Sequence, residues 1–312
     1  MIIHNATIHS PVERFATALH VEGETIVWMG DEDTARYRAA AHPQAALLDA
    51  DGALITPAFH LAHRLDARAD FPRQGISAVH ARVRDAAELT DLRRHVDATA
   101  ILTTGAPGPG AIRLLPSGAS AAEMTEFLTD PGGPAGVEVG TPADLRAFST
   151  LERRGRVYLS STLAVTPAAL QGWEVIVIME GAVRLNLAEL AGAGVPYALA
   201  GEEDPWTLLT RALTEGPGPV SARAAFTALT RGPWRLTPGQ GAPRGVLRVG
   251  AAADFAVWEV EALAVQAPSE ATSFWSTDQR AGTPLLPALG EGETPPRLRA
   301  LYRAGRRTFE GT

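Results

Sequence analysis

The chain has 312 residues, of which 46% are hydrophobic and 20% charged, and its formal net charge is −7. This composition excludes a disordered chain and supplies apolar side chains for one large domain or two smaller ones. The acidic balance excludes the basic surface typical of nucleic-acid-binding proteins, and the absence of cysteine excludes disulfides and thiolate metal sites. Because the start MIIHNATIHS is not a secretory signal and no apolar run approaches roughly 20 residues, we expect a cytoplasmic protein that contacts no membrane.

The first 56 residues predict a small β-structure with one helix. Apolar residues alternate on both sides of Glu22-Gly23-Glu24, which predicts a hairpin. A short helix is expected over residues 31–41, with Asp31 or Asp33 as its N-cap. The strands are expected over residues 2–8, 16–21, 25–29, 46–48 and 53–55.

Strands and helices then alternate up to residue 235, an order typical of a parallel sheet or barrel. Thr141-Pro142 and Thr166-Pro167 are good helix starts, because proline is favoured at the first helical position. Strands are expected over residues 76–83, 100–102, 111–115, 136–139, 157–160, 174–178 and 196–200. Helices are expected over residues 86–94, 121–128, 143–153, 167–171, 185–191, 205–214 and 221–230.

The end of the chain returns to β-structure, with strands expected over residues 245–249, 255–260, 298–303 and 307–309. The simplest assembly pairs the two ends of the chain. This predicts a composite β-sandwich domain from residues 1–56 and 236–312, and a second domain from residues 57–235.

Three segments carry a resemblance to a known family. They are Pro57 to Leu65 (PAFHLAHRL), Val195 to Gly201 (VPYALAG) with Asp204-Pro205-Trp206 and Ser221 to Trp234, and Gly250 to Trp258 (GAAADFAVW) with Phe274 to Asp278. In this order, around an α/β middle, they resemble the amidohydrolase superfamily of metal-dependent hydrolases. The match is to the amidohydrolase-3-like branch, which includes N-substituted formamide deformylases.

The resemblance implies an α/β fold, a (β/α)8 TIM-like barrel with a small β-sandwich built from both chain ends. Members hydrolyse carbon–nitrogen bonds other than peptide bonds, with one or two divalent metals at the carboxyl mouth of the barrel. The middle of this chain has only about 180 residues against roughly 250 for a complete barrel. We therefore expect a reduced or distorted barrel, in which either helices and loops are minimal or a strand–helix unit is missing.

The family pattern implies two histidines on the first strand, a carboxylated lysine or a glutamate on the fourth, histidines on the fifth and sixth, and an aspartate on the eighth. His63 matches the first histidine, while Leu61 and Leu65 stand where an aspartate and the second histidine are expected. Leucine cannot bind a metal. The chain contains no lysine, and no histidine follows His95, so no other alignment restores the carboxylated lysine of the fourth strand or the histidines of the fifth and sixth.

The remaining positions are equally altered. The fifth-strand position falls on Glu138, and the sixth falls on Leu159 or Ser160. The aspartate of the eighth strand is expected near Gly201, whereas Asp204 matches a later Asp-Pro-Trp, so this ligand is deleted. The candidate metal residues are therefore His63, Glu138 and Asp204, and the catalytic residues are unknown.

Three hypotheses follow from the altered ligands. The first is an amidohydrolase-like pseudoenzyme that needs no cofactor and serves in binding or assembly, as a homo-oligomer or with an active paralogue. The second is an active hydrolase of amides, formamides or cyclic ureas. It would bind zinc or another divalent metal through a mixed site drawn from His60, His63, Glu138, Glu202 and Asp204. The third is a barrel that binds a small molecule without catalysis.

Overall fold

The computed structural model describes residues 1–64, 70–83, 85–102, 111–130, 134–152, 156–161, 163, 165–170, 174–180, 186–215, 220–235, 241–267, 274–276, 285–289 and 292–311. The chain divides into two compact units. The first comprises Met1–Phe59, Asp70–Ser77 and Gln240–Thr312, and the second comprises His60–Ala69 and Ala78–Gly239. Residues 70–77, assigned to the barrel domain from the sequence, thus group with the chain ends.

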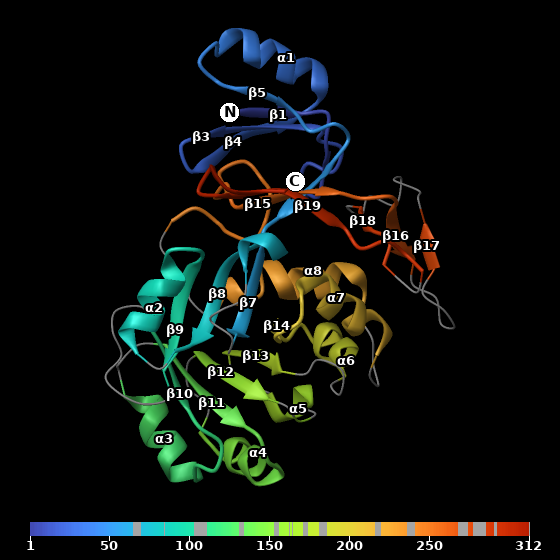
Figure 1. The fold of residues 1–312 in the computed structure, drawn as a ribbon. Coiled ribbons are helices and arrows are strands. Elements are labelled where there is room, and N and C mark those ends of the chain that lie inside the picture. The colour runs from blue at the N-terminus through green and yellow to red at the C-terminus, as the bar shows by residue number, and fades with distance from the viewer. Residues whose placement is uncertain are drawn as a thin grey trace. The chain divides into compact units, whose positions relative to one another are not determined.

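The first unit contains three sheets (Figure 1). One has the order β4-β3-β1-β5, with bounds Thr25–Gly30, Ala18–Glu22, Ile2–His4 and Leu47–Asp49. The second has the order β2-β6-β15-β19-β20, with bounds Thr7–Ile8, Leu54–Pro57, Phe255–Glu259, Arg297–Arg303 and Arg306–Glu310. The third has the order β17-β16-β18, with bounds Phe274–Ser276, Leu263–Ala267 and Leu286–Pro287.

Strands from both ends of the chain share the second of these sheets. β6 pairs antiparallel with β15, with Ile55 opposite Val257. Apolar side chains from both ends also share one core, in which the rings of Phe255 and Tyr302 stack at a centroid distance of 4.5 Å. The composite β-structure predicted from the sequence is present in this unit.

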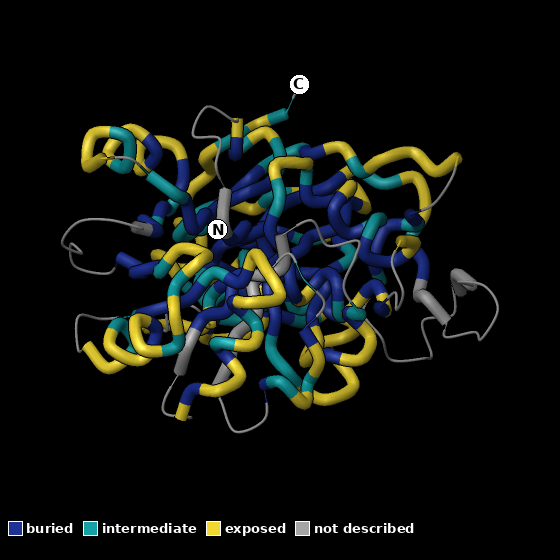
Figure 2. Tube along the Cα trace, turned by 90° about the horizontal axis from the view of Figure 1, so that it is seen from below, coloured by how far each residue is buried: buried dark blue, intermediate teal, exposed yellow. Residues whose placement is uncertain are grey.

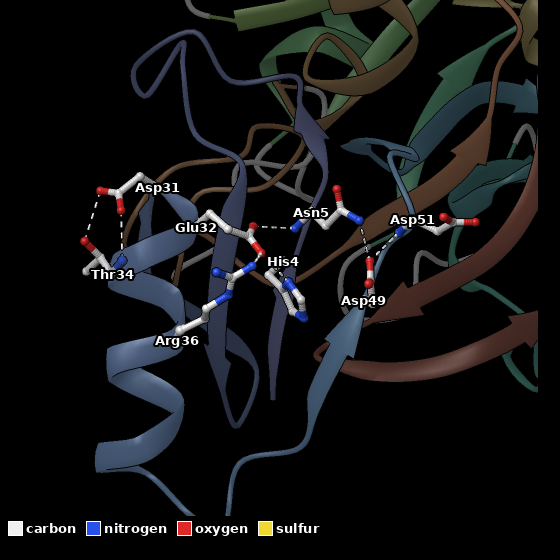
Figure 3. A network of polar contacts seen from close by, with 8 residues as sticks. All are labelled: His4, Asn5, Asp31, Glu32, Thr34, Arg36, Asp49 and Asp51. Atoms are coloured by element: carbon white, nitrogen blue, oxygen red, sulfur yellow. Dashed lines mark hydrogen bonds and ion pairs between the residues drawn. The ribbon is translucent and has the colours of Figure 1, made fainter.

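A network of polar contacts connects helix α1 (Glu32–Ala41) to the strands beneath it (Figure 3). The Glu32 carboxylate lies 2.6 Å from His4 Nδ1 and accepts a hydrogen bond from the Asn5 backbone N–H at 2.8 Å. The Asn5 side chain in turn donates to Asp49. Asp31 caps the helix, as the sequence predicts, by accepting a hydrogen bond from the Thr34 N–H. The network fixes the start of α1 on β1 and β5.

The second unit is a closed barrel in which all eight strands follow one another in chain order from β7 to β14. Each strand from β8 to β13 pairs in parallel with the next strand along the chain, and β14 pairs in parallel with β7. The strands are Phe59–Arg64, Ile76–Arg82, Asp97–Leu102, Ile112–Leu115, Ala135–Val139, Arg156–Ser161, Glu174–Glu180 and Tyr197–Ala200. The predicted TIM-like barrel is therefore confirmed, with its full number of strands.

The barrel segment contains fewer residues than usual because, in its described part, the helices are few and have only four to ten residues each. Between β7 and β8 the described residues contain only the 3-10 turn η1 (Pro72–Gln74), and those between β9 and β10 contain no helix. The helices are α2 (Ala86–Arg93), α3 (Ala121–Thr129), α4 (Pro142–Ser149), α5 (Pro167–Leu170), α6 (Leu187–Gly192), α7 (Pro205–Thr214) and α8 (Ala222–Thr230). Because all eight strands are present, the small size comes from minimal helices and loops and not from a missing strand. No helix in the described ranges is both long and apolar enough to cross a bilayer.

A cluster of buried apolar residues lies in the described part of the barrel interior, and Figure 2 shows buried residues in dark blue along the Cα trace. The cluster joins residues of strands on opposite sides of the barrel, which can meet only through its interior. Its members are Ala62, Ile101, Ile112, Leu114, Tyr158, Ala198 and Ala200. Strand alternation then identifies the other inward positions, including Glu138 two residues after Gly136, which pairs with Tyr158.

Several of the predicted elements differ in the structure. The strand expected over residues 2–8 forms two strands, β1 and β2, which belong to different sheets. Residues 245–249 form no strand, because Gly245 and Gly250 both adopt positive φ angles that interrupt extended backbone. Leu247 is nevertheless buried, and its carbonyl accepts a hydrogen bond from the Ser10 hydroxyl. The helix predicted to reach residue 153 ends at Ser149. In the segment 245–249, Leu247 thus packs on the core from irregular backbone rather than from the predicted strand.

Candidate functional site

The carboxyl ends of the barrel strands form the mouth where TIM-barrel enzymes place their active sites. Arg82 is the last residue of β8, and Glu138 is the penultimate residue of β11. Arg82 pairs with Ile101, a member of the interior cluster, so its side chain leaves β8 on the inward face. Both residues therefore project toward the mouth from inward-facing positions.

Arg82 and Glu138 form an ion pair across this mouth. The guanidinium Nη2 donates to Glu138 Oε1 at 2.6 Å, and the two side chains are 26% and 24% exposed. β9 and β10 lie between β8 and β11 in the sheet order, so the pair spans two intervening strands. The second carboxylate oxygen of Glu138 accepts the Ser117 backbone N–H at 3.3 Å. Glu138 is thus held by a cation and a backbone donor.

A second carboxylate, Asp144, connects the segments that follow β10 and β11. It is 2% exposed and accepts hydrogen bonds from the Ser117 hydroxyl at 2.6 Å and from the backbone of Gly118, Gly140 and Thr141. Burial alone raises the pKa of Asp144, but these hydrogen bonds outweigh it and lower the pKa to about 2. Both carboxylate oxygens of Asp144 accept hydrogen bonds, and Ser117 links Asp144 to Glu138 because it donates to both.

The carboxyl end of β14 is closed by helix α7. A Cβ atom placed on Gly201 would lie 2.8 Å from Leu208 Cδ2, so a longer side chain cannot enter without displacing Leu208. Asp204 caps α7 by accepting the backbone N–H groups of Trp206 and Thr207, and it also accepts the Thr207 hydroxyl. Asp204, the candidate metal residue of this segment, therefore serves as a helix cap.

The sixth strand presents a hydroxyl rather than an imidazole. In β12, Leu159 and Ser160 are both buried, and Ser160 pairs with Glu138 of β11 in the sheet register. The fourth strand, β10, has the sequence Ile-Arg-Leu-Leu and contains neither lysine nor glutamate. These two strands supply no strong metal ligand.

The histidines of the first strand have different positions. The backbone of His63 lies in β7, but its side chain falls outside the described residues, so its proposed metal role stays a prediction. His60 is 1% exposed, and its ring lies 4.4 Å from the His80 ring and 4.2 Å from the Trp234 ring, between centroids. Because His60 is the second residue of β7, it belongs to the amino end of the strand and packs there.

The structure does not bring the predicted site residues together as a set. Glu138 is bound to Arg82, Asp204 caps α7, and the described contacts include none between these two carboxylates. Glu202 is exposed, whereas its neighbour Glu203 forms an ion pair with Arg211 at 2.7 Å. The metal roles of Glu138 and Asp204 also stay predictions.

Sequence reasoning missed Arg82. Its signal was its position near the carboxyl end of the strand predicted over residues 76–83, which is where barrel active sites gather their polar groups. The residues described at the mouth do not fit the family's metal. The carboxylate on the fifth strand is neutralised by a guanidinium, the sixth and fourth strands offer no imidazole or carboxylate, and the eighth-strand position is glycine.

Comparison with known proteins finds relatives by structure. No family model matches the sequence, and no curated protein matches it. A zinc-bound mutant of the atrazine chlorohydrolase TrzN from Arthrobacter aurescens TC1 has a TM-score of 0.67 at 13% identity, covering 98% of this chain and 94% of that one. Enamidase, described as a member of the amidohydrolase superfamily, has a TM-score of 0.59 at 14% identity, covering 99% and 96%.

A zinc-bound adenosine deaminase from Xanthomonas campestris is also similar, with a TM-score of 0.60 at 13% identity and coverage of 98% of this chain and 92% of that one. Identities this low establish the architecture and not the chemistry. The similarity of fold extends over nearly the whole chain. The chain has the fold of the amidohydrolase superfamily.

Proposed function

We propose that this chain is a carbon–nitrogen hydrolase-like protein that no longer catalyses metal-dependent hydrolysis and acts instead in binding or assembly. The observation that carries the proposal is the Arg82–Glu138 ion pair across the barrel mouth. The family's chemistry requires a divalent cation held by carboxylates and imidazoles at that place. In this chain, the cation paired with the Glu138 carboxylate is the guanidinium of Arg82.

The electrostatics of this exchange favour exclusion of a metal. An arginine side chain stays protonated in proteins, so its charge is permanent. A metal bound to Glu138 Oε1 at about 2 Å would lie close to the guanidinium, which occupies a position 2.6 Å from the same oxygen. Like charges at such separations repel strongly at a partly buried site. The hydrolase alternative, with zinc or another divalent metal, therefore requires Arg82 to leave Glu138.

The packing of the interior bears on the remaining alternative, a small-molecule binding barrel. Buried apolar side chains from β7, β9, β10, β12 and β14 form one cluster in the described interior. This cluster occupies space that a small molecule inside the barrel would need, which favours recognition on the outer surface. We therefore propose that the partner is a protein chain, either a second copy or an active paralogue with the same fold.

Metal content and hydrolysis test this proposal together. Purified wild-type protein and Glu138→Ala are compared for bound zinc, manganese and iron, and for hydrolysis of a panel of amides, formamides and cyclic ureas. We expect identical metal content and no turnover in either protein. A metal ion or a hydrolytic activity that is present in wild type and lost in Glu138→Ala would overturn the proposal.

The Arg82→Met variant provides the complementary test, because it removes the charge while keeping a long apolar side chain. If the guanidinium is what excludes a metal, Arg82→Met gains affinity for zinc that the double variant Arg82→Met/Glu138→Ala lacks. Arg94→Met is the control, since Arg94 is exposed and pairs only with Asp91 on its own helix turn among the described contacts. Equal zinc binding by wild type and Arg82→Met would show that the ion pair does not control the site.

A further inference from the structure

Three potential metal ligands meet in the first unit, away from the residues considered so far. His20 and Glu22 lie on the same face of β3, two residues apart, and His42 follows the last residue of α1. One ligand atom from each residue lies within 4.8 Å of the others, and the two histidine rings are 5.2 Å apart between centroids. His42 is fixed at the helix end by its N–H, which donates to the Arg38 carbonyl at 2.9 Å.

His20 is a buried polar side chain without a normal hydrogen bond in the described part of the chain. It is 1% exposed, and its Nδ1 atom has no partner there. Its Nε2 atom lies 3.6 Å from Glu22 Oε1, beyond ordinary hydrogen-bond length. Buried polar groups of this kind are uncommon and often mark the place of an ion or a water. The Nε2 atom, which faces Glu22 without a normal hydrogen bond, therefore keeps bonding capacity beside the Glu22 carboxylate.

We propose that His20, Glu22 and His42 bind a divalent zinc ion, with water as the fourth ligand. Two imidazoles and one glutamate form a known zinc ligand set that leaves one coordination position open. With bonds of about 2.0–2.2 Å in tetrahedral geometry, ligand atoms stand about 3.4 Å apart. The His20–Glu22 separation of 3.6 Å already meets this value, and the exposed Glu22 and His42 side chains are free to close the remaining gap.

The surroundings of His20 determine how it would bind. Burial first, and then the positive charges of the amino terminus and Arg38, lower the pKa of His20. The neutral imidazole is the form that coordinates zinc. The same positive charges oppose a cation, and the Glu22 carboxylate offsets part of that opposition. We therefore expect reversible binding that links the end of α1 to β3, rather than a permanently occupied site.

Zinc titration of the full chain tests the site. Metal-stripped protein is titrated with zinc by calorimetry, and with cobalt by its visible absorption, which reports tetrahedral nitrogen and oxygen ligands. We expect one ion per chain and affinities lower by at least about tenfold in His42→Ala and in Glu22→Gln, as expected for loss of a metal ligand. Both residues are exposed, so neither variant opens a cavity. Circular dichroism confirms that each variant is folded.

His95→Ala is the matched control, because His95 is exposed and belongs to the barrel unit. It should bind zinc as wild type does, and zinc should raise the melting temperature of wild type and His95→Ala but not of His42→Ala. Absence of saturable zinc binding in wild type overturns the proposal. So does wild-type affinity in His42→Ala, which would place the ion elsewhere in the chain.

Discussion

At the scale of single residues, the carboxylates near the barrel mouth differ in the donors that hold them. Glu138 has a guanidinium and one backbone N–H, whereas Asp144 has donors from two loop segments and the N-cap residue of α4. A buried carboxylate surrounded by donors is stabilised as the anion, and its protonation must then weaken the fold. Asp144 is therefore a residue whose contribution depends on pH.

Asp144→Asn tests this contribution. The pKa of Asp144 is about 2 in the folded chain against 3.8 for the free group, so its anion stabilises the fold above pH 3.8. That stabilisation, about 2 kcal/mol, is lost as pH falls from about 4 to 2. Urea unfolding across this range should show a steeper fall for wild type than for Asp144→Asn, which is less stable at pH 7.

The control for this experiment is Glu126→Gln, an exposed carboxylate on α3 without a resolved partner through its side chain in the described contacts. It should unfold with the wild-type pH dependence. If Asp144→Asn also retained the wild-type slope between pH 4 and pH 2, the carboxylate would not be the group that titrates.

The residues of the site were predictable from sequence only in part. Leu61, Leu65 and the missing lysine are predicted to be lost ligands, because the pattern of the family that the sequence resembles fixes those positions along the chain. The pairing of Arg82 with Glu138 could not, since it joins residues 56 apart through the closure of the barrel. Side-chain partners across a barrel depend on register and stagger, which no local pattern encodes.

At the scale of elements, the junction of β14 and α7 controls what the eighth strand can present. Gly201 ends the strand region, and Leu208 of α7 packs where a Cβ would stand. Gly201→Ala should therefore destabilise the chain by about 1–3 kcal/mol, the usual cost of overpacking a well-filled site. The loss should be smaller in a Leu208→Ala background, and urea unfolding of the double-mutant cycle measures that coupling.

Gly192→Ala provides the contrast, because a Cβ at the end of α6 would meet nothing within 4 Å. It should be neutral or slightly stabilising, since alanine restricts the unfolded chain more than glycine does. Equal effects of the two alanine substitutions would mean that Leu208 does not close the eighth-strand position.

The elements themselves were mostly predictable where local signals agreed. α7 was expected over its observed bounds, and the structure shows Asp204 as its N-cap and Pro205 at the first helical position. β16, β17 and β18 were missed, since they are short and gain their stability from pairing with one another. Short strands lack the alternation that reveals longer ones.

At the scale of the whole molecule, two compact units share one chain, and the order of segments was enough to predict the barrel and the composite β-structure. Trp258 of β15 connects the two chain ends in the first unit. Its indole N–H donates to the Thr56 hydroxyl at 2.9 Å, and its ring lies 5.9 Å from the Phe59 ring, between centroids. A Cβ on Gly75 would stand 2.5 Å from the same indole.

Trp258→Ala should remove about 3–5 kcal/mol of stability, the range for deleting a buried aromatic side chain. Hydrogen exchange should then show lower protection of the β6, β15 and β19 amides. Val249→Ala, at a side chain that is 52% exposed, should change stability by less than about 0.5 kcal/mol. Unchanged protection of β6 in Trp258→Ala would contradict a role for the indole in holding the chain ends together.

The pairing of β6 with β15 has a consequence for biosynthesis. β6 ends at Pro57 and β15 begins at Phe255, so the ribosome must add about 200 residues before β6 can pair with β15. At translation rates of about 5–20 residues per second, this delay is roughly 10–40 s. During this delay, the edge of β6 that will pair with β15 is open to other nascent chains. All eight barrel strands leave the ribosome in chain order before β15 does. We therefore expect any dependence of newly made chains on chaperones to be strongest before β15 leaves the exit tunnel.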